Sequence, residues 1–93
     1  MNIKNLKLKD LAPAKYNHRT ITPQALEGLS KSLEKFGYLS PLIVNVHGGV
    51  QTVISGHQIL KVMLAEGAVK AECVIVDFDP IMEKAANIAL NSE

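Results

Sequence analysis

The stretch "VISGHQILKVMLAEG" (residues 53–67) predicts a strand that turns through one glycine into a helix, with Gly56, His57 and Gln58 at the corner. Backbone N–H groups at the start of a helix have no partner within the helix, and the helix dipole is positive there. A corner of this kind can hold a phosphate group. It can equally be an ordinary strand-to-helix turn, so it is a candidate phosphate site that needs support from the rest of the chain.

Outside this corner the titratable residues form no strong metal or catalytic pattern. His18, His47 and His57 lack the spacing of a metal site. Asp77 and Asp79 follow a predicted strand and precede a predicted helix. Aspartates there usually form turns and caps, although they could also bind magnesium beside a nucleotide. Because of this spacing of the histidines, we expect no metal site. Since no nucleophile stands beside a base, we also expect little or no catalysis.

Length and composition indicate one globular domain. The 93 residues are 47% hydrophobic and 20% charged, which suits a folded chain with a modest core. No apolar run is long enough to span a membrane, and lysines interrupt the N-terminus where a signal peptide would be apolar. Cys73, the only cysteine, excludes an internal disulfide and lies in an apolar run typical of an inert, buried thiol. We therefore expect a single cytoplasmic domain over residues 1–93 without a membrane partner, which could be the first part of a longer protein.

Basic residues are concentrated in the first third of the chain, although the net charge is only +1. They are Lys4, Lys7, Lys9, Lys15, Arg19, Lys31 and Lys35. Only Asp10, Glu27 and Glu34 oppose them there, and the rest of the chain is acidic. This asymmetry permits a basic face toward an anionic partner, and the alternative is an ordinary solvated surface.

The elements before the corner are expected to be an edge strand, a loop and a helix. "NIKNLKLKDL" (residues 2–11) predicts the edge strand, and "APAKYNHR" (residues 12–19) predicts the loop. Thr22 predicts an N-cap with Pro23 at the first helical position, and Gly37 predicts a helix end in a left-handed conformation. The predicted helix buries one apolar stripe, formed by Leu26, Leu29, Leu33 and Phe36.

Next to the corner, the sequence predicts a hairpin and a second helix. In "PLIVNVHGGVQTVIS" (residues 41–55), the pair Gly48-Gly49 supplies the positive φ angles that a tight hairpin requires. The second helix follows the corner at once and stops at Gly67. Its inward residues are expected to be Leu60, Met63 and Leu64.

The end of the chain predicts a strand and a last helix. "AECVIVDFD" (residues 71–79) has a continuous apolar centre, which suggests burial on both faces. Asp79 is expected to cap a helix opened by Pro80. Its inward residues are expected to be Ile81, Ala85, Ile88 and Ala89. The order β-α-β-β-α-β-α indicates a small α+β domain with a mixed sheet.

Three stretches together resemble the ParB/sulfiredoxin fold family, and above all the ParB-like domains found alone or joined to DNA methyltransferases in bacterial and phage systems. "LKLKDLAPAKYNHR" (residues 6–19) resembles the family's opening strand and its Pro-x-x-Tyr-Asn-Pro-Arg loop. "LEGLSKSLEKFGYLSPLIVN" (residues 26–45) resembles the helix and the Gly-x-x-x-Pro strand after it. "VISGHQILKVMLAEG" resembles the Gly-His-Gln-Arg-Leu-Lys-Ala corner. In this order the three cover nearly the whole chain.

The resemblance implies a nucleotide or phosphate pocket made by the glycine corner and the arginine of the opening loop. In the family, ParB proteins bind CTP and clamp on DNA, sulfiredoxins use ATP, and other members are kinases or nucleases. CTP or ATP with magnesium is thus the implied cofactor. The matching phosphate-binding positions of this chain are Gly56, His57, Gln58, Arg19, Asn17 and Asn91.

The resemblance also implies work on DNA, in chromosome or plasmid partitioning or as a transcriptional regulator, with a homodimer or a joined downstream domain as partner. Excess basic residues then become the expected DNA contacts. They are Lys4, Lys7, Lys9, Lys15 and Arg19.

Some positions depart from the family pattern. His18 replaces the loop proline, and Ile59 replaces the corner arginine, which removes the donors best suited to phosphate. Lys61, two positions on, lies on a different part of the helix and is a poor substitute. Sulfiredoxin chemistry needs a cysteine where this chain has His57, so that activity is excluded.

Three functions therefore stay open. The first is a module that binds DNA or a nucleotide with little catalysis, which the charge asymmetry favours. The second is a nuclease or nucleotide hydrolase that uses His57, Arg19 and Asp77, which the missing arginine and acid–base pair disfavour. The third is a degenerate fold kept for protein interaction, which the change at Ile59 makes credible.

Overall fold

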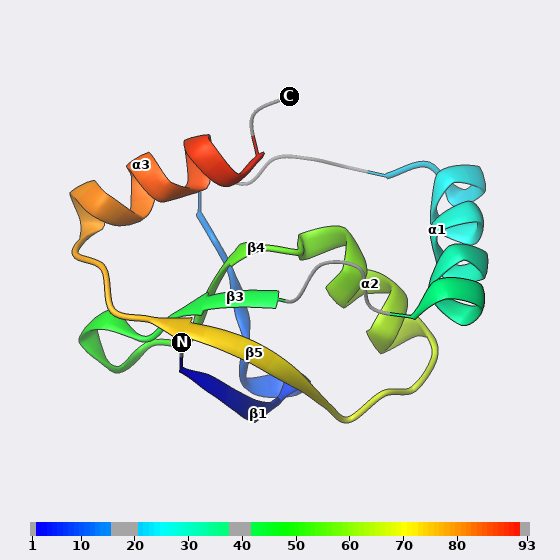
Figure 1. The fold of residues 1–93 in the computed structure, drawn as a ribbon, viewed down its shortest axis with the longest axis horizontal. Helices are drawn as coiled ribbons and strands as arrows, with labels where there is room; N and C mark the ends of the chain where they lie inside the picture. Colours follow the sequence, from blue (N-terminus) through cyan, green and yellow to red (C-terminus); the bar gives the residue numbers. More distant parts are fainter. Residues whose placement is uncertain (1, 16–20, 38–41, 92–93) are drawn as a thin grey trace.

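The structure is a computed structural model that describes residues 2–15, 21–37 and 42–91. The strands form one sheet in the order β1-β5-β3-β4-β2 (Figure 1). Their bounds are β1 Ile3–Lys7, β2 Ala12–Pro13, β3 Leu42–Asn45, β4 Thr52–Ser55 and β5 Lys70–Val76. The helices are α1 Pro23–Phe36, α2 His57–Ala65 and α3 Pro80–Asn91, and two single 3-10 turns are η1 Leu8–Asp10 and η2 His47–Gly49.

The sheet is mixed, as expected. The pairs β1–β5 and β3–β4 are antiparallel, whereas β3–β5 and β2–β4 are parallel. Strand β1 lies at the sheet edge, which confirms the expected edge strand. Strand β2 is an addition, because the stretch from residue 12 was expected to be a loop. Ala12 and Pro13 instead pair with Thr52 and Val53 and close the other edge. The α+β class is confirmed, with one short strand more than predicted.

The two faces of the sheet carry different helices. Side chains alternate between faces along a strand, and Leu42, Val44 and Val53 pack with α2 in the main core. On the opposite face, Asn45 and Ile54 meet α3. The main core consists of Leu8, Leu42, Val44, Val53, Leu60, Met63, Ala71 and Cys73. Figure 1 shows α1 beside α2 at one end of the sheet and α3 toward the other end. None of the helices in the described parts of the chain is long and apolar enough to cross a membrane.

Helix α1 begins and ends near the predicted residues. The Ala25 N–H donates to Thr22 Oγ1 at 3.1 Å, and Pro23 occupies the first turn. Leu26, Leu29 and Leu33 are half-buried along the predicted stripe. Gly37 ends the helix at φ 71° and ψ −159°. The positive φ is as expected, but this ψ lies outside the left-handed helical region.

Helix α2 is closed by hydrogen bonds after its last turn. The Gly67 N–H donates to the Leu64 carbonyl at 3.1 Å and the Ala68 N–H to the Met63 carbonyl at 2.9 Å. This pair of hydrogen bonds, together with the positive φ of Gly67, is a Schellman motif. Leu60 and Met63 are buried as predicted, but Leu64 is exposed because it lies on the side of α2 away from the sheet core.

The hairpin between β3 and β4 confirms the predicted pairing with a wider connection. Gly48 and Gly49 have φ angles of 71° and 77°, as the sequence predicts. The connection runs over residues 46–51 and includes η2, so it is not a tight two-residue turn. Strand β5 is also less enclosed than predicted, since Cys73 is buried but Val74 and Val76 are only half-buried.

The predicted inward face of α3 is wrong. Ile81 is 83% and Ile88 is 65% exposed. Ala85 and Ala89 are exposed as well. The helix is turned so that Glu83 and Asn87 face the sheet, where Glu83 accepts a hydrogen bond from Asn45 and Asn87 donates one to the Ile54 carbonyl. Unpaired buried polar groups are costly, so these hydrogen bonds, and not hydropathy, select the inward face.

Candidate functional site

Gly56 forms the corner between β4 and α2 in a left-handed conformation, with φ 97° and ψ 20°. A Cβ atom there would lie 2.6 Å from Leu42 Cδ2 and 3.4 Å from the Leu42 Cα. Leu42 is fully buried in the main core and cannot move away freely. The fold itself therefore requires a glycine at this position, whether or not a phosphate approaches it.

The N-terminus of α2 differs from those of the other two helices. Thr22 caps α1, and Asp79 caps α3 because its Oδ1 accepts from the Met82 N–H at 2.8 Å. At α2 the cap residue is Gly56, which has no side chain to offer an oxygen. Helix starts carry unsatisfied donors and positive partial charge. Helix α2 thus begins with the kind of terminus that accepts an anion.

His57 connects this corner to the end of β2. Its imidazole is half-buried, and Nε2 lies 3.5 Å from the buried Ala14 N–H. If Nε2 accepts from that N–H, the ring proton lies on Nδ1. Ala14 belongs to the predicted opening loop of residues 12–19, so the structure brings the beginning of that loop to the α2 N-terminus.

The other predicted phosphate-binding positions are placed unevenly. Gln58 is half-buried in the first turn of α2. Asn17 and Arg19, and His18 between them, lie outside the described residues. Asn91 is the last residue of α3, and its side-chain placement stays a prediction. For these loop and helix-end residues the family match remains the basis of the assignment.

Ile59, which replaces the arginine of the family pattern, contributes to the packing of the core. Ile59 is half-buried and packs against the main core. Lys61 is exposed on α2, consistent with its being a poor substitute. Ile59 thus makes an apolar contact at the position where the resemblance implies an arginine.

The predicted DNA contacts in the described part of the chain are all exposed, three of them on β1 and the turn after it and one, Lys15, after β2 at the opposite edge of the sheet. Lys4 and Lys7 belong to β1, Lys9 to η1, and Lys15 follows β2. The strand register adds one residue that sequence reasoning missed, because Lys70 of β5 lies directly opposite Lys7. Two facing ammonium groups concentrate positive charge at this edge. Only the long-range pairing of β1 with β5 reveals this.

Asp77 does not lie with His57. Asp77 Oδ1 is 2.7 Å from His47 Nδ1, beside the hairpin connection at the end of β3. His57 follows β4 near the start of β3, because Ser55 pairs with Ile43. The four residues of β3 separate the two positions by about 13 Å. Among the described residues, no three His, Cys, Asp or Glu side chains gather as a metal site would require.

Cys73 is enclosed in the core. It is fully buried, and burial raises the pKa of its thiol. A thiol that is neutral and inaccessible is a poor nucleophile. The predicted inert role is consistent with this placement.

Comparisons with known proteins agree with this arrangement. The sequence profile of the ParB N-terminal domain matches residues 1–92. A comparison with curated protein sequences finds no match. Among solved structures, the C-terminally truncated chromosome-partitioning protein ParB from Caulobacter crescentus complexed with CTP-gamma-S superposes with a TM-score of 0.82 at 19% identity. That match covers 99% of this chain and 53% of the other, so the chain spans about half of that ParB.

Two further structures share the fold. The same Caulobacter crescentus protein complexed to the centromeric parS site gives a TM-score of 0.76 at 18% identity, covering 95% of this chain and 46% of the other. Sulfiredoxin from Arabidopsis thaliana gives a TM-score of 0.75 at 18% identity, covering 91% of this chain and 96% of the other. At such low identities these matches establish the fold alone.

Proposed function

Because this chain belongs to the family of ParB N-terminal domains, we propose that it is a DNA-associated module that binds a nucleotide through its phosphates where β4 meets α2. One observation carries the proposal: the N-terminus of α2 has no side-chain cap, and His57 joins it to Ala14, within the predicted loop of residues 12–19. The Caulobacter crescentus ParB structures contain CTP-gamma-S in one case and parS DNA in the other, which supports both ligand classes.

In this proposal the phosphates rest on the first turn of α2. The corner residues Gly56, His57 and Gln58 supply donors, and from the family resemblance we assign further phosphate contacts to Arg19, Asn17 and Asn91. The nucleotide is CTP or ATP, and magnesium would come with its phosphates, as this ion commonly does. Little or no catalysis is expected from the domain alone. The setting, whether partitioning or regulation beside a DNA methyltransferase, is proposed from the family resemblance only.

Restoring the family's arginine tests the nucleotide site. We expect Ile59→Arg to raise the affinity for CTP or ATP by about tenfold or more, since a charge-assisted hydrogen bond contributes about 1.5–3 kcal/mol. The variant should also unfold more easily, because the substitution removes the apolar contact of Ile59 with the main core. The arginine side chain must keep its charged group at the surface and cannot replace that contact. Calorimetric titration with each nucleotide and magnesium measures the first effect, and thermal unfolding measures the second.

The matched loss variant is Arg19→Ala, with Lys61→Ala as control. Arg19→Ala should weaken binding about tenfold, while Lys61→Ala should leave it within about twofold. A folded Ile59→Arg variant with unchanged affinity would mean that His57 and Gln58 only turn the chain. Turnover of plasmid, CTP or ATP that disappears in His57→Ala would instead support the enzyme alternative.

DNA binding should be weak and strongly dependent on salt. Phosphate contacts release counterions, so the logarithm of the binding constant should fall with the logarithm of the salt concentration. Because the surface carries only a few lysines, we expect a slope of about −2 to −4. Replacing Lys7 and Lys70 with glutamine should reduce that slope by about 2. Fluorescence anisotropy with a short labelled duplex over a salt series measures the slope.

The control removes two exposed lysines elsewhere, Lys31 and Lys84. It should change the slope much less than the Lys7 and Lys70 variant does. Lack of binding even at low salt would overturn the DNA part of the proposal and favour the protein-interaction alternative.

A further inference from the structure

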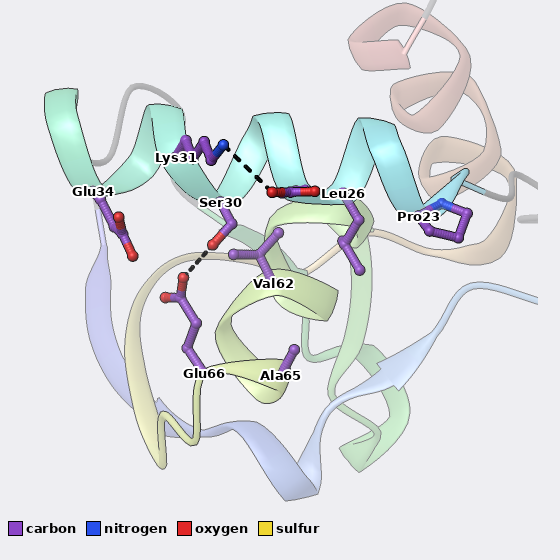
Figure 2. A pocket seen from close by; sticks show the side chains of 9 residues that line it. Pro23, Leu26, Ser30, Lys31, Glu34, Val62, Ala65 and Glu66 are labelled. Carbon is purple, nitrogen blue, oxygen red and sulfur yellow. Dashed lines mark hydrogen bonds and ion pairs between the residues drawn. The ribbon is translucent and has the colours of Figure 1, made fainter.

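A long groove runs between α1 and α2, on surface that the proposed phosphate site does not use. Its larger part encloses about 500 Å³. Its floor is apolar, formed by Leu26 of α1 and by Val62 and Ala65 of α2 (Figure 2). A second hollow of about 210 Å³ shares Glu34 and Glu66 with the first and continues over Leu33, Met63 and Ala68. The two form one groove along much of α1.

The rim of this groove is acidic. Among the described residues of the lining, Glu27, Glu34 and Glu66 contribute three carboxylates, and Lys31 is the one basic residue. Lys31 Nζ is already 3.4 Å from Glu27 Oε1 on the same helix. The Ser30 hydroxyl donates to Glu66 Oε1 at 2.5 Å and joins the two helices across the groove, as Figure 2 shows. The lining thus keeps two net negative charges above an apolar floor.

This combination excludes the ligands of the proposed function. Phosphates of DNA or of a nucleotide would be repelled by the rim. A purely apolar segment would leave the carboxylates without counter-charges. A segment with apolar side chains on one face and lysine or arginine beside them satisfies both the floor and the rim.

We propose that the α1–α2 groove docks a basic amphipathic helix of a partner protein. Helix α1 has 14 residues and is about 21 Å long, so a partner helix of about four turns fills the groove. Its apolar residues, spaced three and four apart, lie on Leu26, Leu33 and Ala65, the apolar lining side chains that stay accessible. Its basic residues meet Glu34 and Glu66, which border both hollows.

The test uses a fluorescent peptide of about four turns, with leucines on one helical face and lysines flanking them, and a twin with glutamate at every lysine. We expect the lysine peptide to bind and the glutamate twin not to bind in anisotropy titrations. Glu34→Gln with Glu66→Gln should weaken binding about fivefold or more, because two rim charges are lost. The amide oxygen that Glu66→Gln introduces can still accept from the Ser30 hydroxyl, so the groove keeps its shape.

The control removes two exposed carboxylates elsewhere, as Asp10→Asn with Glu72→Gln. It should leave affinity within about twofold. Amide shifts in NMR spectra should fall on α1 and α2. Equal binding of the twin, equal effects of the control, or shifts confined to α3 would overturn the proposal. Self-association abolished by the Glu34 and Glu66 changes would also overturn it, since the occupant would be a second copy of this chain.

Discussion

Replacing Gly56 with alanine should lower the free energy of unfolding by about 2–5 kcal/mol, a large part of the stability of a small domain. A left-handed backbone costs a residue with a Cβ about 1–2 kcal/mol. The new methyl group would lie 2.6 Å from Leu42 Cδ2 and close to the Leu42 backbone, and overpacking a core adds about 1–3 kcal/mol. Urea unfolding followed by circular dichroism measures the change.

Gly48→Ala separates the two causes. Gly48 also has a positive φ, 71°, but a Cβ atom there would meet nothing within 4 Å. Its alanine variant should therefore lose only about 1–2 kcal/mol, the backbone part alone. If the two variants are equally destabilised, the contact with Leu42 contributes nothing and the glycine at the corner has only a conformational role.

Helix boundaries were predictable because their signals are local. Thr22 caps α1 and Pro23 opens it, as the sequence predicts. Gly67 closes α2 in a positive-φ conformation, with one backbone hydrogen bond from its own N–H and one from the Ala68 N–H. Asp79 caps α3 in the same predictable way. In each case a residue and its nearest neighbours decide the structure, so no long-range contact is needed to read it.

Orientation was not predictable where a distant partner decides it. The apolar stripe of α3 predicts Ile81 and Ile88 inward, but both are exposed. The deciding residue is Asn45, about 40 positions earlier, whose buried amide selects Glu83 as the inward side chain. Hydropathy patterns within α3 carry no information about that amide.

The candidate site shows the same division. The corner itself follows from the order of strand, glycine and helix, and its glycine is where the sequence places it. The contact between Gly56 and Leu42 depends on how β3 packs beside β4, and the facing pair Lys7 and Lys70 depends on strand register. These tertiary relations decide what the corner tolerates and where positive charge gathers.

Helix α3 is thus fastened to the sheet by polar contacts that centre on Asn45. The Asn45 side chain is buried, with its residue only 3% exposed. Its Nδ2 donates to the Phe78 carbonyl at 2.9 Å and to Glu83 Oε1 at 2.8 Å. Its Oδ1 accepts from the Phe78 N–H at 2.8 Å and from the His47 N–H at 3.2 Å. All four hydrogen-bonding positions of the amide are in use.

Asn45→Ala should therefore cost about 2–4 kcal/mol of unfolding free energy, because removing one partner leaves several buried groups without hydrogen bonds. Asn5→Ala, on the exposed edge strand, should change stability by less than about 0.5 kcal/mol. Asn87→Ala should fall between them, since the hydrogen bond to the Ile54 carbonyl is one of the contacts it loses.

Hydrogen exchange locates the effect. In Asn45→Ala the amides of α3 should lose protection first, while those of α2 stay protected, because α2 packs on the opposite face through apolar contacts. Equal loss in both helices would show that Asn45 supports the whole core. Unchanged α3 protection, with stability near that of Asn5→Ala, would show that the exposed apolar helix is held by something other than this amide.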